Sequence, residues 1–405
     1  MRVEIKPSKP RGTIIAPPSK SMAHRLLICA GLSEGGSVVR HLAFSEDVKA
    51  TIACLTALGA QIRLDGDMAY VKGTDVRKSL GKSAVLDCNE CGSTLRFFTP
   101  LCMLSGEERI LCGAPYLMTR PMSVYEEIAQ KQGIRFEKSA DSITVQGKLQ
   151  SGVYEVAGNI SSQFISGLLF ALPLLDGDSE IRILPPVESK PYIDMTVQAL
   201  TEFGITITAD DNIYKVKGGQ RYSPRGVTVE GDYSNAAFFE ALNYTGADVT
   251  VEGLREYSLQ GDKVYKILFE NIKSGKNPID ISDCPDLGPI LFAVAAICGG
   301  ARFIGTRRLR IKESDRAQAM RQELAKFGIA VTVGENDVIV HGGELQKPSE
   351  LLDGHNDHRI VMALAVLATV TGGVIEGAEA VNKSFPDFFD RLNDLGVDLT
   401  YGMDQ

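Results

Sequence analysis

One pattern recurs along the whole sequence: an amphipathic helix that ends at a glycine, then a strand, a polar turn and a second strand. The helices of the clear copies end at Gly59, Gly133, Gly204, Gly328 and Gly396, and a weaker copy ends at Gly275. Glycine suits the left-handed conformation that closes many helices, and the turn residues suit β-hairpins. Such units cannot bury their apolar faces alone and must associate. The sequence therefore predicts an α/β (α+β) fold of about six repeat units.

The predicted exposed helices of these units span 51–58, 124–132, 195–203, 263–272, 317–327 and 388–395. A second type of helix alternates with them and is apolar almost all round, which indicates burial. The predicted buried helices span 21–32, 93–104, 161–175, 234–244, 286–298 and 357–369. We expect their N-termini to lie at one end, where free N–H groups and the helix dipole favour an anion.

The chain has 405 residues, which exceeds one ordinary hydrophobic core and predicts two domains. Three units around shared buried helices make one domain, and six make two. Residues 1–16 precede the first unit and begin with a strand-like alternation, which we expect to pair with the C-terminal half. The sequence therefore predicts an inserted domain over 18–228 and a discontinuous domain over 1–17 plus 229–405, with the active site in the cleft between them.

Composition limits the classes of partner. The net charge is −8, which argues against nucleic acid or an anionic membrane as the main partner. The eight cysteines are scattered, and Cys88 and Cys91 lack the second Cys/His pair of a zinc site. The N-terminus has no signal-peptide pattern, and no apolar run reaches transmembrane length. We expect a soluble cytoplasmic protein without a disulfide framework or a metal.

The segment 17–25 begins with two prolines, which stop any preceding element. Ser19 or Ser21 can then cap a helix over 22–32. Lys20 and Arg25 add positive charge to the first turn of that helix, where the backbone already favours a phosphate or carboxylate. The alternative is a capped helix with two solvated cations.

Comparable groups occur near the other buried helix starts. They lie in 90–96, 120–122, 161–163 and 189–192 of the inserted domain, and at 286, 310–316, 357–359 and 383–386 of the other. Cations outnumber acids at these positions although the chain is acidic overall. This contrast favours polyanionic substrates, and the alternative is that each charge is merely solvated.

This ordered set of motifs resembles the 5-enolpyruvylshikimate-3-phosphate synthase (3-phosphoshikimate 1-carboxyvinyltransferase) family of enolpyruvyl transferases over the full length. The motifs are Ser-Lys-Ser…Arg, Gly-Ser-Thr-Leu-Arg, Arg-Pro-Met, Ser-Ser-Gln, Ser-Lys-Pro-Tyr, Lys-Glu-Ser-Asp-Arg and Asp-His-Arg, which begin at 19, 92, 120, 161, 189, 312 and 357. The resemblance implies a two-domain inside-out α/β barrel or prism. Its six βαβαββ-type units, three per domain, enclose buried helices.

The resemblance also implies a reaction. The family transfers the enolpyruvyl (carboxyvinyl) group of phosphoenolpyruvate to the 5-hydroxyl of shikimate 3-phosphate and releases phosphate. The reaction is an addition–elimination through a tetrahedral intermediate on the shikimate pathway to chorismate and aromatic amino acids. It implies two small-molecule substrates, no metal and no other cofactor.

Residue by residue, the resemblance implies two binding sets. The shikimate 3-phosphate set is Lys20, Ser21, Arg25, Ser161, Ser162, Gln163, Ser189, Tyr192, Asp286 and Lys312. The phosphoenolpyruvate set is Lys20, Gly92, Arg96, Arg120, Gln163, Arg316, Arg359 and Lys383. Hydroxyls and Gln suit a polyol, arginines bind anionic groups bidentately, and Gly92 lets backbone approach a ligand.

Three residues are candidates for catalysis. Asp286 is expected to take the proton of the 5-hydroxyl, and Glu313 to protonate the vinyl carbon. Lys20 is expected to assist at the leaving phosphate with a lowered pKa. Simpler roles compete: Asp286 as a helix N-cap, and Glu313 as an i,i+3 partner of Arg316. His358 is expected to be structural.

Several positions depart from the commoner bacterial pattern. They are Pro18, Glu90, Cys91, Phe97 and, in an ambiguous local alignment, Arg308. These changes bear on ligand affinity and on the response to glyphosate more than on the reaction. Because Gly92 is retained, we predict that glyphosate inhibits in competition with phosphoenolpyruvate.

Two rival functions remain. The first is an enolpyruvyl transferase that acts on UDP-N-acetylglucosamine, whose reactive cysteine lies in a loop shortly before an arginine. Cys112 precedes Arg120 at a longer offset and is expected to be structural. The second is a non-catalytic repeat protein that binds anions. We expect a monomer, since no separate assembly element is present, and a closure of the two domains on substrate.

Overall fold

The computed structural model describes residues 1–81 and 83–402, which form two compact units. Unit 1 comprises Met1–Pro17 and Gly231–Gln405, and unit 2 comprises Pro18–Glu230. The predicted boundary at 228 lies two residues before this division. Within unit 1 the Asp232 amide donates to Pro17 O at 2.7 Å, and within unit 2 the Ser19 amide donates to Glu230 O at 2.7 Å. The two chain crossings therefore leave each unit from neighbouring positions.

The described residues of unit 2 form three four-stranded sheets of one design. Their orders are β14-β3-β5-β4, β6-β7-β9-β8 and β10-β11-β13-β12. The first pair of each sheet is parallel and the other two pairs are antiparallel. The strands are β3 Gly36–Arg40, β4 Gln61–Asp65, β5 Met68–Lys72, β6 Ala84–Asp87, β7 Arg109–Cys112, β8 Arg135–Lys138, β9 Ser142–Gln146, β10 Val153–Ala157, β11 Ser179–Leu184, β12 Ile207–Asp210, β13 Ile213–Val216 and β14 Gly226–Thr228.

Unit 1 varies the same design. The sheet β16-β17-β19-β18 repeats it, whereas β20-β21-β1-β22 takes its third strand from the N-terminal segment, and β15 pairs only with β2. The strands are β1 Arg2–Ile5, β2 Arg11–Ile15, β15 Asp248–Glu252, β16 Ile279–Asp280, β17 Ala301–Ile304, β18 Val331–Val333, β19 Asp337–Val340, β20 Leu352–Asp353, β21 Gly373–Glu376 and β22 Leu399–Gly402. The expected pairing of the N-terminal segment with the C-terminal half therefore runs through β1 and β2.

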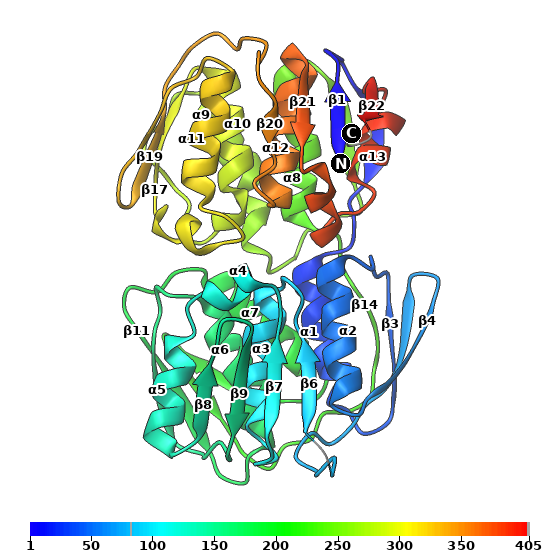
Figure 1. The fold of residues 1–405 in the computed structure, drawn as a ribbon, viewed down its shortest axis with the longest axis vertical. Helices are drawn as coiled ribbons and strands as arrows, with labels where there is room; N and C mark the ends of the chain where they lie inside the picture. Colours follow the sequence, from blue (N-terminus) through cyan, green and yellow to red (C-terminus); the bar gives the residue numbers. More distant parts are fainter. Residues whose placement is uncertain (82, 403–405) are drawn as a thin grey trace. The chain divides into compact units, whose positions relative to one another are not determined.

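Helices fill the centre of each unit, and the strands lie outside them (Figure 1). The buried helices are α1 Lys20–Gly31, α3 Gly92–Cys102 and α6 Ser162–Ala171 in unit 2, and α8 Tyr233–Ala241, α10 Gly288–Cys298 and α12 His358–Thr371 in unit 1. The remaining helices are α2 Glu46–Ala57, α4 Pro115–Thr119, α5 Ser123–Gln132, α7 Lys190–Glu202, α9 Tyr265–Lys273, α11 Arg316–Lys326 and α13 Phe388–Asp394. Strands such as β7 and β9 alternate buried and partly exposed residues, so one face of each covers the helices.

The glycines that punctuate the repeats behave as expected. Gly133 closes α5 with φ 67°, and the other repeat glycines also have positive φ. Two predicted helix starts are wrong, since α2 begins at Glu46 and α7 at Lys190. The first turn of α2 follows the Ser45 cap and contains two acidic residues, and the first turn of α7 contains a proline. Neither turn shows the apolar periodicity by which the rest of each helix was located. Among the described residues, no helix is both long and apolar enough to cross a membrane.

Candidate active site

Lys20 begins helix α1 and already has a carboxylate partner. Ser19 caps the helix by accepting the Met22 amide, which selects between the two predicted caps. Lys20 Nζ donates to Asp47 Oδ2 at 2.7 Å, and both side chains are mostly buried. Asp47 was not among the predicted site residues, because the predicted helix began at residue 51 and α2 begins at Glu46. The available signal was Ser45 followed by two acidic residues, a typical helix N-terminus.

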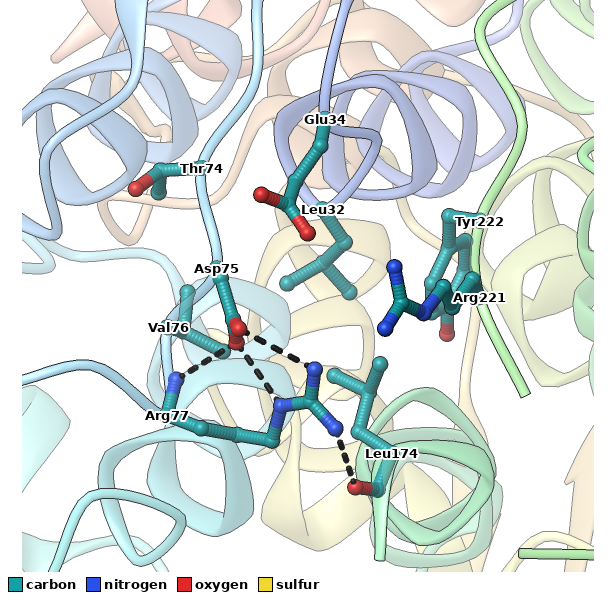
Figure 2. A pocket seen from close by; sticks show the side chains of 9 residues that line it. All are labelled: Leu32, Glu34, Thr74, Asp75, Val76, Arg77, Leu174, Arg221 and Tyr222. Atoms are coloured by element: carbon teal, nitrogen blue, oxygen red, sulfur yellow. Dashed lines mark hydrogen bonds and ion pairs between the residues drawn. The ribbon is translucent and has the colours of Figure 1, made fainter. Parts of the chain in front are cut away.

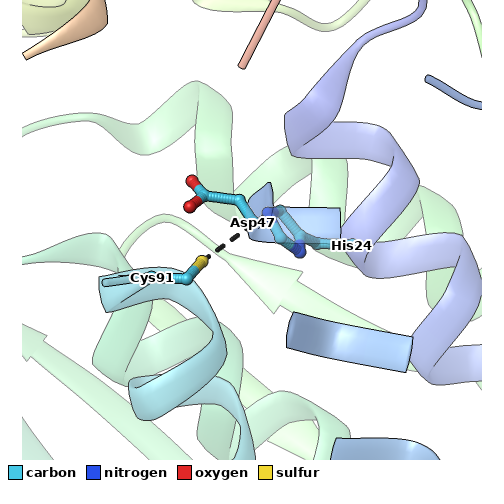
Figure 3. A group of neighbouring side chains, drawn as sticks. All are labelled: His24, Asp47 and Cys91. Atoms are coloured by element: carbon cyan, nitrogen blue, oxygen red, sulfur yellow. Dashed lines mark hydrogen bonds between the residues drawn. The ribbon is translucent and has the colours of Figure 1, made fainter. Parts of the chain in front are cut away.

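A chain of polar groups connects helices α1, α2 and α3 beside this ion pair. Thr94 Oγ1 and Thr51 Oγ1 are 2.8 Å apart, and Thr51 Oγ1 lies 2.7 Å from His24 Nδ1. The other ring nitrogen, Nε2, lies 3.9 Å from Cys91 Sγ, and Figure 3 shows this sulfur directed toward the His24 ring. Burial, together with Lys20, holds the pKa of His24 well below its usual value, so the ring is neutral at pH 7.

Cys91 occupies the N-cap position of helix α3, where its sulfur accepts the Thr94 amide at 3.4 Å. Burial, followed by Asp47, raises the pKa of the Cys91 thiol to about 12. One ligand atom from each of His24, Asp47 and Cys91 lies within 4.8 Å of the other two. The cysteine that departs from the commoner pattern thus joins a compact nitrogen, oxygen and sulfur group next to Lys20.

Arg25 is buried and is held by neutral groups. Its Nε donates to Thr196 Oγ1 at 2.9 Å, and its two terminal nitrogens donate to Ser21 O at 2.6 Å and Tyr192 O at 2.8 Å. The guanidinium carbon also lies 5.3 Å from the centre of the Phe97 ring. Burial lowers the pKa of Arg25 to about 10, which leaves it charged at pH 7.

Arg96 is held in a similar way between helices α3 and α6. It donates to Gln163 Oε1 at 2.7 Å and to Pro121 O at 3.1 Å. The Gln163 side chain in turn donates through Nε2 to Ser93 Oγ at 2.9 Å. Its backbone N–H donates to the Oγ of Ser161, the N-cap residue of α6. This network connects three of the motifs singled out in the sequence.

Gly92 lies against Arg120. A Cβ atom at Gly92 would overlap the Arg120 guanidinium, and the next atom, Nη2, would be only 3.2 Å away. The absence of a side chain at Gly92 therefore lets the Arg120 guanidinium pack against the N-terminal turn of α3. Arg120 itself is buried at its position between α4 and α5.

Ser189 precedes helix α7 and adopts the left-handed conformation with φ 57°. It is fully buried, and its carbonyl accepts the Tyr192 amide at 3.1 Å. Non-glycine residues rarely adopt this conformation, which tends to persist at binding and catalytic sites. Ser162 is also buried, at the start of α6. Unit 2 thus gathers its predicted residues around the N-terminal ends of α1, α3, α6 and α7.

Unit 1 centres its predicted residues on Asp286. The Asp286 carboxylate accepts Lys312 Nζ at 3.0 Å, Arg316 Nη1 at 2.9 Å and Arg359 Nη2 at 3.3 Å. Burial acts to raise the pKa of Asp286, but Arg359, Lys312 and Arg316 outweigh it and hold it well below its usual value. The prediction that Asp286 could be a plain N-cap is wrong, because Leu287 occupies that position of α10.

Arg316 is fully buried and has three carboxylate partners. Its Nη2 donates to Glu313 Oε2 at 2.7 Å, and its Nε donates to Asp357 Oδ2 at 2.8 Å. Burial alone would lower the pKa of Arg316, but Asp357, Glu313 and Asp286 raise it above its usual value. The expected i,i+3 pair of Glu313 and Arg316 is confirmed. Asp357 also caps helix α12.

The other predicted residues of unit 1 surround this group. Burial is the main cause that lowers the pKa of Lys312 to about 8, and Arg308 and Arg316 add to it. Lys383 Nζ donates to Asn356 O at 2.6 Å, one residue before Asp357. His358 is buried in the first turn of α12. Unit 1 therefore brings together three cations, three carboxylates and the capped start of α12: Lys312, Arg316 and Arg359 with Asp286, Glu313 and Asp357.

A separate cavity of about 140 Å³ lies in unit 2 near the C-terminal end of α1 (Figure 2). Arg77 in its wall is already paired with Asp75, Nε to Oδ1 at 2.8 Å, and also donates to Leu174 O. The other lining residues are Leu32, Glu34, Thr74, Val76, Arg221 and Tyr222. None of the predicted site residues lines this cavity, so it is distinct from the helix-terminus group.

Comparisons with known proteins give the geometry its context. A family model for EPSP synthase (3-phosphoshikimate 1-carboxyvinyltransferase) matches residues 5–392. The chain is 40% identical to the 3-phosphoshikimate 1-carboxyvinyltransferase of Clostridium novyi (strain NT), with 97% of each protein covered. It is also 40% identical to that of Clostridium kluyveri, with 98% of each covered.

Two solved structures share the fold. EPSP synthase from Acinetobacter baumannii has a TM-score of 0.79 at 23% identity, over 99% of this chain and 100% of that one. The enolpyruvyl transferase NikO from Streptomyces tendae has a TM-score of 0.78 at 14% identity, over 100% and 99%. The expected two-domain α/β fold is confirmed. The extent of the sequence matches shows that the chain belongs to the EPSP synthase (3-phosphoshikimate 1-carboxyvinyltransferase) family.

Proposed function

We propose that this protein transfers the enolpyruvyl (carboxyvinyl) group of phosphoenolpyruvate to the 5-hydroxyl of shikimate 3-phosphate and releases phosphate. The observation that carries the proposal is the Asp286 carboxylate held by Lys312, Arg316 and Arg359, with Glu313 on the same arginine. This group offers two carboxylates for proton transfer and three cations that can bind an anionic substrate. Membership of the family supports the same assignment.

Shikimate 3-phosphate combines hydroxyls with a phosphate, and the proposed residues match both. Arg25 carries a charge whose partners are all neutral oxygens, so it attracts a phosphate. Hydroxyl and amide groups suit the sugar-like ring. The proposed set is Lys20, Ser21, Arg25, Ser161, Ser162, Gln163, Ser189, Tyr192, Asp286 and Lys312.

Phosphoenolpyruvate has two anionic groups and needs several cations. Arg96 and Arg120 lie beside the N-terminal turn of α3, and Arg316 and Arg359 surround Asp286. Arginine forks bind carboxylate and phosphate bidentately. The proposed set is Lys20, Gly92, Arg96, Arg120, Gln163, Arg316, Arg359 and Lys383.

In the proposed reaction, Glu313 gives a proton to the terminal vinyl carbon of phosphoenolpyruvate. The 5-hydroxyl oxygen attacks the adjacent carbon while its proton passes to Asp286. The tetrahedral adduct then returns a methyl proton to Glu313 and loses phosphate, which restores the double bond as an enol ether. Lys20 assists proton transfer at the leaving phosphate.

The cations around Asp286 have a second effect in this scheme. Without a bound substrate, Arg359, Lys312 and Arg316 lower the pKa of Asp286 and so make this carboxylate a weak base. Phosphoenolpyruvate bound to Arg316 and Arg359 brings negative charge to the same guanidinium groups. That charge raises the proton affinity of Asp286, so the arrival of one substrate prepares the base for the hydroxyl of the other.

The test is phosphate release from phosphoenolpyruvate with shikimate 3-phosphate as acceptor. A parallel reaction contains UDP-N-acetylglucosamine instead. We expect release in the first reaction only. Phosphate release only in the second reaction would assign the transfer to UDP-N-acetylglucosamine. No phosphate release in either reaction would favour a non-catalytic anion-binding protein. The position of Cys112 on β7, where its sulfur donates to Leu86 O, disfavours a role as the reactive cysteine of the second enzyme.

We also propose that the protein acts as a cytoplasmic monomer. The sequence contains no separate assembly element, and each unit has its own extensive hydrophobic core. Sedimentation velocity should give one species near 43.8 kDa. A dominant species of twice that mass would contradict the monomer.

A further inference from the structure

We propose that His24, Asp47 and Cys91 form a binding site for a thiophilic divalent cation, with Zn²⁺ as the best match. The three side chains come from α1, the first turn of α2 and the cap of α3, and all three are buried. Their ligand atoms lie within 4.8 Å of one another (Figure 3). Imidazole, carboxylate and thiolate together suit zinc better than magnesium or calcium, which prefer oxygen ligands alone.

The distances are close to those of a tetrahedral site. Zinc bonds of about 2.3 Å to sulfur and about 2.0 Å to nitrogen place these two atoms roughly 3.6 Å apart at the tetrahedral angle. The Cys91 Sγ to His24 Nε2 distance is 3.9 Å. A movement of a few tenths of an ångström therefore brings these two ligands to bonding positions, and a turn of the Asp47 carboxylate supplies the third.

The surrounding groups already orient the ligands. His24 Nδ1 is fixed by Thr51 Oγ1, which Thr94 Oγ1 supports, so the ring directs Nε2 at Cys91. A hydrogen bond to the second ring nitrogen is what metal-bound histidines usually have. The Cys91 sulfur accepts the Thr94 amide at the N-terminus of α3, so this contact also fixes the position of the sulfur. This second set of contacts distinguishes the group from three side chains that are merely close.

Binding proceeds by exchange. The Cys91 S–H bond breaks, its proton goes to solvent, and the sulfur electron pair forms the bond to the metal. Asp47 turns from the Lys20 ammonium to the cation, and water completes the fourth position. Lys20, which is 13% exposed, loses its carboxylate partner next to a new positive charge and is displaced. On the proposed function Lys20 is catalytic, so the metal should inhibit turnover.

The primary test measures binding without any assay of catalysis. The reduced, metal-free protein is titrated with Cd²⁺, followed by the thiolate-to-cadmium absorption, and with Co²⁺, followed by its visible bands. We expect a one-to-one complex whose sulfur band disappears in Cys91→Ser. Because His24→Asn removes a ligand itself, its affinity should fall by more than the ~10–100-fold that loss of a group supporting a ligand typically costs. Circular dichroism of each variant without metal establishes that it is folded.

Two cysteines of the same unit provide matched controls. Cys112 is the more exposed thiol, and Cys88 lies near Cys54 as a competing soft site. Cys112→Ser and Cys88→Ser should bind Cd²⁺ like the unchanged protein. A band that survives in Cys91→Ser, or one that is lost in either control variant, would overturn the proposed site.

A second measurement tests the link to Lys20. Zn²⁺ should reduce phosphate release by at least tenfold, a chelator should restore it, and Cys91→Ser should resist Zn²⁺ relative to its own metal-free rate. Cadmium binding at Cys91 with undiminished turnover in Zn²⁺ would overturn the displacement of Lys20. If the protein released no phosphate under any condition, the proposed function would be wrong. The Cd²⁺ and Co²⁺ titrations would still decide whether the metal site exists, because they do not depend on turnover.

Discussion

The two units hold the arginines of their candidate sites in different ways. In unit 2, Arg25 and Arg96 are held by hydroxyl, carbonyl and amide oxygens. In unit 1, Arg316 is held by three carboxylates, and one of them, Asp286, also binds Lys312 and Arg359. Lys20 with Asp47 and Arg109 with Glu107 are exceptions in unit 2.

The difference separates two tasks. Neutral partners position a guanidinium without cancelling its charge, so Arg25 keeps its attraction for an anion. Carboxylate partners cancel the charge of a cation, and in return Arg359, Lys312 and Arg316 lower the pKa of Asp286 and align it with Glu313 in one network. Unit 2 is therefore suited to recognition, and unit 1 to proton transfer combined with anion binding. Four experiments test this division.

The largest effect is expected at Asp286. Asp286→Asn keeps the shape but removes the base and the anion among three cations, so kcat should fall by about 10²–10⁴-fold. Steady-state kinetics with both substrates measures it. Asp283→Asn, at an exposed position three residues earlier, is the control and should be near wild type. Equal activity in the two variants would remove unit 1 from the proton transfer.

The division also predicts unequal stability effects. Asp357→Asn retains the cap of α12 but leaves buried Arg316 without its most deeply buried carboxylate partner, which should cost about 3–5 kcal/mol. Thr196→Val removes one neutral partner of Arg25 and should cost about 1 kcal/mol. Urea denaturation followed by circular dichroism compares them. Similar losses would mean that the kind of partner does not matter.

Gly92→Ala sharpens the unit 2 side of the comparison. The added methyl group overlaps the Arg120 guanidinium and must move it, at a cost of about 1–3 kcal/mol. We expect KM for phosphoenolpyruvate to rise about tenfold and inhibition by glyphosate to weaken at least as much. Inhibition constants from competition against phosphoenolpyruvate measure this. Gly36→Ala, at a glycine without positive φ and with nothing within 4 Å of a Cβ atom, is the control and should behave like the wild type. Full inhibition of Gly92→Ala would contradict the prediction.

The smallest effect is a pH dependence at Lys312. Its pKa is lowered to about 8, so it is protonated at pH 7 and loses its charge as the pH rises through 8. If its charge binds shikimate 3-phosphate, kcat/KM for that substrate should decline several-fold between about pH 7 and 9, with an inflection near the pKa of the free enzyme. Lys312→Arg, which keeps its charge above that range, should abolish the inflection. Lys276→Arg at an exposed position should not.

Local rules predicted most of the fold. Apolar periodicity and terminal glycines located the helices, because α1, α3 and α12 are buried all round and Gly133 closes α5 as expected. Helix starts without apolar periodicity were missed. The start of α2 was one of them, and Asp47 was missed with it.

The site residues were predictable only as types of side chain near helix ends. The partners of those side chains were not predictable, since packing sets them: Arg25 and Thr196 are 171 positions apart. The same is true of the three carboxylates around Arg316. The assignments of substrate and catalytic roles to these residues stay predictions until the variants are measured.

The placement of β1 has a consequence for how the chain is made. Its four residues lie between β21 and β22, yet the ribosome translates them more than 360 positions before either neighbour. At about 5–20 residues per second, the strand emerges on the order of 20–70 s before β21 exists. Unit 2 is contiguous and can fold during that interval. Val3 and Ile5 are buried in the folded protein, but on the nascent chain they stay exposed until β21 and β22 have been made. Unit 1 can therefore complete its folding only after β22 has been synthesised.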